Sequence, residues 1–140
     1  MNKYMRTYTS TIKIKSTNRV EMINITHKVS EILRSSEIKN GIVLLFTRHT
    51  TSALTINEDE HRLKKDIMDL LEKIVPENAD YRHNEIDNNA DAHLRSSLMQ
   101  PFLIIPIVNG SLQLGTWQSL FFLELDGPRN REIIATIIGE

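Results

Sequence analysis

A hairpin signal near the C-terminus constrains the fold of this chain most strongly. Asn109-Gly110 joins the apolar run at residues 102–108 to a second, shorter run at 112–114. Asn-Gly readily adopts the positive-φ turn that matches the twist of two antiparallel strands. Pro106 interrupts the first run and predicts that this strand lies at a sheet edge or carries a bulge. At least part of the chain is therefore expected to form antiparallel sheet.

Further strands are predicted on both sides of two helical segments. The clearest helix covers residues 59–74, where apolar residues recur at steps of three and four. Another helix is expected after Thr26, which suits an N-cap, and residues 91–99 predict a short third helix. Alternating or continuous apolar residues indicate strands at residues 7–15, 20–25, 42–46, 53–57, 116–125 and 133–138. This order favours one α+β domain over residues 1–140, with a largely antiparallel or mixed β-sheet.

Three finer expectations concern the first helix and the strands after it. Asn40-Gly41 is a signal that ends the helix begun at Thr26. The uninterrupted apolar run 42–46 is typical of a strand that is covered on both faces. Residues 53–57 alternate and are predicted to form its neighbour in the sheet.

Composition limits the classes of partner. The chain has 17 Lys+Arg and 18 Asp+Glu and a formal net charge of −1, so no overall field attracts nucleic acid or an anionic membrane. It has no cysteine, which excludes disulfides and thiolate metal ligands. No apolar run approaches the roughly 20 residues of a membrane span, and the first residues do not form a signal peptide. We expect a cytoplasmic protein that recognises anions only through local residues.

Chemistry-bearing residues gather in the loop after the third predicted strand. Residues 48–52, Arg-His-Thr-Thr-Ser, combine a guanidinium, an imidazole and three hydroxyls. Hydroxyls, backbone N–H groups and arginine are good ligands for phosphate oxygens, so Thr50 and Thr51 are candidate phosphate ligands. A solvated polar connection is the alternative. Glu58 either favours the N-terminus of the next helix or points toward His49.

Two histidines bracket a polar loop. His83 and His93 lie on either side of a segment that carries Glu85 and Asp87. Two imidazoles with nearby carboxylates could ligate a divalent metal, and a charged surface loop is the alternative. On a helix, His93 would share a polar ridge with Ser96 and Ser97, which makes Ser97 a candidate ligand-binding residue.

Polar residues also crowd both ends of the predicted strand 116–125. Thr116 and Gln118 flank the only tryptophan at its start, and Asp-Gly-Pro-Arg at 126–129 closes it. A turn accounts for the first three of those closing residues, whereas Arg129 is not required by the turn and could reach an anion. Trp117 is expected in the core or at an interface, with Gln118 on the opposite strand face.

Taken together, these segments resemble the YjbQ-like family, whose members are described as secondary thiamine-phosphate synthase enzymes. The resemblance implies a small α+β fold assembled as a homotrimer. It also implies that His49, His83 and His93 gather around a divalent metal such as Zn or Mg, with Glu58 and Arg129 near them. The matching motifs are His49-Thr50-Thr51, Thr55-Ile56-Asn57-Glu58, Tyr81-Arg82-His83, Asp91-Ala92-His93, Leu114-Gly115-Thr116-Trp117-Gln118 and Asp126-Gly127-Pro128-Arg129.

The implied reaction joins a pyrimidine-methyl diphosphate to a thiazole phosphate and releases diphosphate. His49, Glu58 and Arg129 are then the candidate catalytic residues, and binding of the phosphorylated substrate is expected from Thr50, Thr51, Ser97, Thr116 and Gln118. Charge separation in this reaction calls for a clamp on the leaving group and exclusion of water.

Two other functions remain open: a non-catalytic trimer that binds a divalent metal or a phosphorylated metabolite, and a zinc hydrolase with Glu58 as its base. An oligomer is expected in any case, because Trp117, Phe121 and Phe122 give one strand apolar residues on both faces.

Overall fold

A computed structural model describes residues 4–140, and this part of the chain forms two antiparallel sheets with three α-helices and one 3-10 helix. The α+β class predicted from the sequence is confirmed. The elements are β1 (Arg6–Lys15), β2 (Glu21–Asn24), α1 (Thr26–Ser36), β3 (Gly41–Thr47), β4 (Ser52–Asn57), α2 (His61–Ile74), η1 (Arg82–Glu85), α3 (Ala90–Leu98), β5 (Phe102–Val108), β6 (Ser111–Leu112), β7 (Ser119–Glu124) and β8 (Asn130–Gly139).

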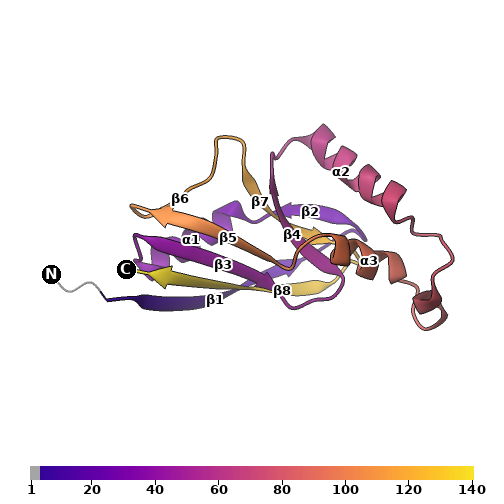
Figure 1. Cartoon of the computed structure of the whole chain (residues 1–140), viewed down its shortest axis with the longest axis horizontal. Coiled ribbons are helices and arrows are strands. Elements are labelled where there is room, and N and C mark those ends of the chain that lie inside the picture. Colours follow the sequence, from indigo (N-terminus) through magenta and orange to yellow (C-terminus); the bar gives the residue numbers. More distant parts are fainter. Residues whose placement is uncertain (1–3) are drawn as a thin grey trace.

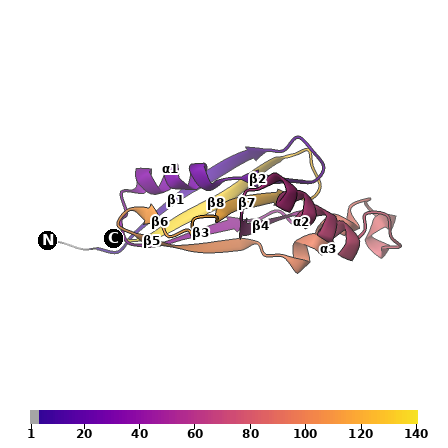
Figure 2. The same cartoon turned by 90° about the horizontal axis from the view of Figure 1, so that it is seen from above.

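The larger sheet has the strand order β1-β8-β3-β5-β6, and the smaller sheet has the order β2-β7-β4. Figure 1 shows the long strands of the larger sheet running along the molecule, with α2 and α3 toward the end opposite the two termini. Figure 2 shows α1 lying along one side of the larger sheet. In the part of the chain that the structure describes, no helix is long and apolar enough to cross a bilayer.

The hydrophobic core lies between the two sheets and beneath α1. Because side chains alternate along a strand, one face of the larger sheet supplies the buried residues of β1, β3, β5 and β8. Leu120 and Phe122 of β7 pack into this core from the smaller sheet, while Phe121 and Leu123 on the other face of β7 pack with Leu71 of α2. Both faces of β7 are therefore covered within one copy, so this strand is not the reason to expect an oligomer.

The outer face of the larger sheet is different. Strand β3 was predicted to be covered on both faces, and this is wrong: Val43 and Leu45 are buried, but Ile42 and Phe46 are 38% and 39% exposed. Neighbouring exposed apolar residues on β5 extend this surface, which we call the outer apolar face: Ile42, Phe46, Phe102, Ile104 and Val108.

The predicted pairing of β3 with β4 is also wrong. Strand β3 pairs with β5 and β8, whereas β4 pairs with β7 in the other sheet. The loop at residues 48–51 carries the chain from one sheet to the other. A short connection between two strands usually indicates a hairpin. Here β3 lies in the larger sheet and β4 in the smaller sheet, so the loop lies where both sheets end.

The boundaries of the first helix differ from the prediction. Thr26 does not cap α1, because its hydroxyl accepts a hydrogen bond from the backbone N–H of Leu120 at 2.8 Å. The helix ends at Ser36, where Glu37 takes the left-handed conformation with φ 58°, rather than at Asn40-Gly41. The hairpin prediction is confirmed, since Asn109 and Gly110 have φ angles of 50° and 79° between the paired strands β5 and β6.

Candidate functional site

A basic pocket lies where β1, the loop 48–51 and the start of β8 meet. Its volume is about 650 Å³, and its lining includes four cationic residues and a single carboxylate. Lys13 and Lys15 alternate along β1 with buried isoleucines, so both ammonium groups lie on the outer face of the sheet. The lining residues are Lys13, Ile14, Lys15, Arg48, His49, Asn130, Arg131 and Glu132. The whole chain has a formal net charge of −1, so an anion is attracted only where cations are grouped locally. The basic pocket is such a group.

His49 is held in one orientation at this pocket. Its Nε2 accepts a hydrogen bond from the backbone N–H of Glu132 at 3.0 Å, so the proton of the neutral ring is on Nδ1. Burial lowers the pKa of His49, and the nearby positive charge of Arg131 lowers it further. The ring is therefore a neutral Nδ1–H donor at pH 7, with no free lone pair for a metal in this arrangement.

A buried ion pair supports the floor of the pocket. Arg131 donates through Nε and Nη2 to the two carboxylate oxygens of Glu124, at 2.9 and 2.5 Å. Nη2 also donates to Thr51 Oγ1 at 2.8 Å, and Ser16 Oγ donates to Glu124 Oε1 at 2.7 Å. Burial by itself would raise the pKa of Glu124, but the hydrogen bonds from Arg131 and Ser16 outweigh it and hold that pKa below its usual value.

Sequence reasoning missed this pair, although a signal existed. Glu124 is the one charged residue in the apolar strand β7. Arg131 lies on the same face of β8 as Ile133 and Ala135, which are buried. Charged residues at core positions are rare unless they are paired. Thr51, predicted to bind phosphate, is instead a buried partner of Arg131, whereas Thr50 is exposed.

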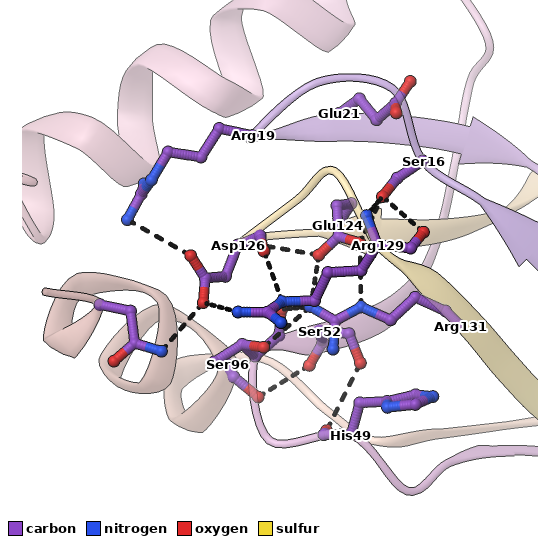
Figure 3. A network of polar contacts seen from close by, with 12 residues as sticks. Ser16, Arg19, Glu21, His49, Ser52, Ser96, Glu124, Asp126, Arg129 and Arg131 are labelled. Atoms are coloured by element: carbon purple, nitrogen blue, oxygen red, sulfur yellow. Dashed lines mark hydrogen bonds and ion pairs between the residues drawn. The ribbon is translucent and has the colours of Figure 1, made fainter. Parts of the chain in front are cut away.

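Arg129 lies close to this network but is bound by the turn that precedes it. Its Nε donates to the carbonyl oxygen of Asp126 at 2.8 Å, and its Nη2 donates to Asp126 Oδ2 at 3.0 Å. Figure 3 shows the Asp126 carboxylate between Arg19 and Arg129. Asn89, which precedes α3, donates to the same carboxylate at 2.9 Å. Arg129 therefore has a carboxylate partner already, which makes it a weaker anion ligand than the sequence predicts.

A second ion pair fixes helix α3. Arg19 donates to both oxygens of Asp91 at 3.0 Å, and Asp91 is 1% exposed. The hydrogen bond to Asp91 raises the pKa of Arg19 above its usual value. Arg95, one turn along α3, donates to Glu72 of α2 at 2.5 Å. Asp91, the first residue of the motif Asp91-Ala92-His93, is therefore structural, because it holds α3 to the loop before β2.

His83 and His93 come together as predicted, but His49 does not join them. The two ring centroids lie 4.8 Å apart, with an interplanar angle of 75°. They line a cavity of about 280 Å³ that also includes Asp80 and Tyr81. Within residues 4–140 no group of three or more histidines or carboxylates is placed to hold a metal ion. One copy of the chain therefore supplies two imidazoles, which is fewer than a protein zinc site uses.

The remaining candidates near the helices lie outside the basic pocket. Ser97 is exposed and its hydroxyl donates to the carbonyl of His93 at 3.0 Å. Ser96 donates to the carbonyl of Ser52 at 2.7 Å, so it faces the smaller sheet rather than a shared ridge with His93. Glu58 does not cap α2, because the carboxylate of Glu60 accepts from the first turn of that helix.

Thr116 and Gln118 lie at the far end of β7 from the basic pocket. They belong to a loop, residues 113–118, that projects between β6 and β7 in Figure 1. The six residues of β7 and the flanking residues span about 20 Å, so this loop cannot reach the pocket of its own copy. Gln118 Oε1 accepts from Gly115 N–H at 2.8 Å, and Trp117 is 72% exposed. The sequence predicts Trp117 in the core or at an interface. The core is excluded by this exposure, so a place at an interface remains a prediction.

The comparisons with known proteins agree on one family. The family model described as UPF0047 protein YjbQ-like matches residues 10–140. A UPF0047 protein of Methanothermobacter thermautotrophicus is 53% identical over 137 residues, covering 98% of this chain and 96% of the relative. Protein YugU of Bacillus subtilis is 39% identical over 131 residues, covering 92% and 98%.

Solved structures give the same result. A crystal structure of a YbjQ-like protein of unknown function from Sulfolobus solfataricus has a TM-score of 0.96 at 38% identity, covering 98% of this chain and 100% of that one. A protein of the yjbq/upf0047 family from Clostridium acetobutylicum has a TM-score of 0.87, also at 38% identity, covering 91% and 98%. The chain therefore belongs to the YjbQ-like family, UPF0047.

Proposed function

We propose that this protein binds a small phosphorylated metabolite in the basic pocket and transfers its organic group, in a reaction of the thiamine-phosphate synthase type. The observation that carries the proposal is the lining of the pocket: Lys13, Lys15 and Arg48 against one carboxylate, Glu132, in about 650 Å³. A volume of this size suits a small ligand, and the excess of cations suits a phosphate or diphosphate. The proposal also places the protein in the cytoplasm, as the sequence predicts.

The proposed chemistry needs a clamp on the leaving group more than it needs a base. The thiazole nitrogen forms a bond to the methylene carbon of the pyrimidine, the bond from that carbon to oxygen breaks, and its electron pair leaves with diphosphate. The attacking nitrogen carries no proton, so none must be removed. The cations of the pocket stabilise the charge that develops on diphosphate, and His49 Nδ1–H can donate to one of its oxygens. His49 then acts as a donor instead of a base.

A divalent metal, if bound, would neutralise part of the charge on diphosphate. The described residues of one copy do not supply three ligands for it, and the Nε2 of His49 is already engaged. No step of the proposed reaction is therefore assigned to a metal.

The alternative proposal is a non-catalytic protein that binds a divalent metal or a phosphorylated metabolite. The close approach of His83 and His93 favours it, because two imidazoles with a centroid distance of 4.8 Å could share one ion whose remaining ligands come from elsewhere. Metal analysis of the purified protein tests this: metal in fixed proportion to protein that both His83→Ala and His93→Ala release would support it, and protein free of metal after dialysis would count against it.

We also propose that the protein assembles with itself as a homotrimer. The support is the outer apolar face, where five large apolar side chains are 38–53% exposed on neighbouring strands. Contiguous apolar surface of this kind is unusual on a monomer. Light scattering at micromolar concentration tests it. Ile104→Glu is expected to shift the mass toward one chain, with Lys73→Glu on α2 as the control, and a wild-type monomer would contradict the proposal.

The reaction is tested by incubating the purified protein with both precursors, with and without Mg²⁺, and measuring thiamine phosphate. The double variant Lys13→Gln/Lys15→Gln and the single variant His49→Ala are expected to lower the rate, because they remove pocket cations and a donor. Lys73→Gln, an exposed lysine of α2 outside the pocket, is the matched control. If the wild type and the three variants all form thiamine phosphate at the same background rate, the transferase proposal is rejected. The non-catalytic binding protein is then the function that stands.

A further inference from the structure

We propose that the cavity between α1 and the β5–β6 hairpin is a second ligand site, which binds a small organic anion with an apolar body. Its volume is about 380 Å³. It lies where β8 ends, since the backbone N–H of its lining residue Lys39 donates to Glu140, whereas the basic pocket lies where β8 begins. The two are therefore roughly 20 Å or more apart along that strand. Figure 2 shows α1 and β6 at the end of the molecule that holds the termini.

Two cations border this cavity. Lys39 lies beside the hairpin turn, where its Cδ and Nζ are 3.2 and 3.5 Å from the position that a Cβ on Gly110 would occupy. The lysine stem thus packs where the glycine has no side chain, which keeps the ammonium group at the cavity. Thr26, Ser30 and Arg34 follow one another at steps of four along α1, so they line the cavity from one face of the helix. In the described part of the chain no carboxylate lines the cavity, so its charge is positive.

The floor of the cavity is apolar and its walls are held together without a ligand. Leu33 and Ile38 are buried, and the half-buried Leu112 packs against the same core. The backbone N–H of Gly110 donates to the carbonyl oxygen of Lys39 at 2.8 Å, which fixes the hairpin turn to the segment after α1. A cavity that is formed in advance costs its ligand less conformational entropy.

A motif of the sequence leads to the same cavity. Leu114 lines it and begins the segment 114–118, whose polar residues Thr116 and Gln118 are predicted to bind a phosphorylated substrate. Those two residues lie at the far end of β7 from the basic pocket, in the loop that continues from Leu114. The motif that the basic pocket leaves unused therefore borders the second cavity.

A small organic anion matches this arrangement. Carboxylate or phosphate oxygens accept charge-assisted hydrogen bonds from Arg34 and Lys39, and the hydroxyls of Ser30 and Ser111 can donate to further oxygens. An apolar body displaces water from the floor, and the volume is within the range of small-molecule pockets. An inorganic anion leaves the floor unused, and an uncharged apolar molecule leaves the cations unused. Each is expected to bind more weakly than a molecule that combines both parts.

The experiment follows the backbone amide signals of ¹⁵N-labelled protein during titration with phenyl phosphate. Inorganic phosphate and benzyl alcohol serve as the two half-ligands, and benzoate tests a carboxylate against a phosphate head group. The signals of Gly110 and Leu112 should shift and saturate with phenyl phosphate or benzoate, at a Kd about tenfold or more below that of either half-ligand.

The variants separate this cavity from the basic pocket. Arg34→Gln/Lys39→Gln should raise the Kd for phenyl phosphate about tenfold or more, and both residues are exposed, so the variant should fold. Arg62→Gln/Lys73→Gln, with the same exposed residue types on α2, is the matched control and should bind like the wild type.

Three results would overturn the second site. They are unshifted signals of Gly110 and Leu112, a Kd that Arg34→Gln/Lys39→Gln leaves unchanged, and a Kd that rises in Lys13→Gln/Lys15→Gln instead, because the probe then occupies the basic pocket. This site does not depend on the function proposed for the basic pocket. Failure of the transferase reaction, with phenyl phosphate still bound through Arg34 and Lys39, would reject the proposed reaction alone.

Discussion

The basic pocket and the His83–His93 pair contain the same kinds of residue but are built differently. His49 lies against a buried ion pair, Arg131–Glu124, and its ring receives a backbone hydrogen bond at 3.0 Å. The two other histidines contact each other edge to face, in a shallow cavity lined mostly by exposed or half-buried residues of η1, the loop before it and α3. A side chain held by a buried network has one orientation and a shifted pKa. The comparison teaches that motif residues become a defined site only where the surrounding core fixes them.

The largest expected effect is on the ion pair beneath the basic pocket. Arg131→Met leaves the fully buried carboxylate of Glu124 without its partner, so the free energy of unfolding should fall by about 3–5 kcal/mol. Urea denaturation followed by circular dichroism measures it. The double variant Arg131→Met/Glu124→Gln should recover part of the loss, because no charge is left buried. A loss below about 1 kcal/mol for the single variant would mean that the pair does not support the pocket.

A smaller effect is expected where the network meets α3. Asp91→Asn removes the charge that accepts two hydrogen bonds from Arg19 and leaves a poorer acceptor, which should cost about 1–3 kcal/mol of unfolding free energy. The same denaturation experiment measures it, with Asp66→Asn on the exposed face of α2 as control. If Asp91→Asn and Asp66→Asn behave alike, the ion pair to α3 adds nothing measurable.

The pH dependence of stability should show whether the fold lowers the pKa of His49. The pKa of His49 is lowered in the folded protein, so below its ordinary value of 6.5 the unfolded chain binds the proton more readily. The wild type should therefore lose stability relative to His49→Gln as the pH falls through this window, and the two should run parallel above it. Unfolding free energies measured from pH 5 to pH 8 check this prediction; curves that stay parallel throughout would contradict it.

At lower pH, the dependence of the unfolding free energy on pH should be determined by Glu124. Its pKa is depressed in the folded protein, so its contribution to stability is present above the ordinary value of 4.5 and is lost as the pH falls through the folded value. Acid unfolding of the wild type should be steeper below pH 4.5 than that of the double variant Arg131→Met/Glu124→Gln. Identical acid limbs would show that this carboxylate is not held in its charged form by the fold.

The smallest effect is expected at the paired histidines. His83→Ala should change the unfolding free energy by less than about 0.5 kcal/mol without added metal, since the residue is exposed. Addition of Zn²⁺ should raise the melting temperature of the wild type and not of His83→Ala if the pair holds a metal. An equal response to zinc in both proteins would remove the metal from the alternative proposal. A large loss of stability without metal would instead show that the comparison between the two regions was drawn wrongly.

Much of the fold followed from local patterns, while most of the site did not. The Asn109-Gly110 turn, the apolar stripe of α2 and the alternation of β1 each depend on a few neighbouring residues, and each formed where it was expected. The site depends on which strands end together. Strands β3 and β4 looked like neighbours because their loop is short, but they belong to different sheets. The position of the loop 48–51 was therefore decided by packing between layers.

By itself the sequence determined the α+β class, the antiparallel pairing around the hairpin and the family, because periodicity, turn residues and ordered motifs are read from residues close together in the chain. Only the tertiary structure decided that Arg131 and Glu124 pair beneath His49, and that Thr116 and Gln118 lie about 20 Å away along β7. The physical reason is that buried charges find their partners across sheets rather than along the chain, and neither the partner nor the distance is encoded in local spacing.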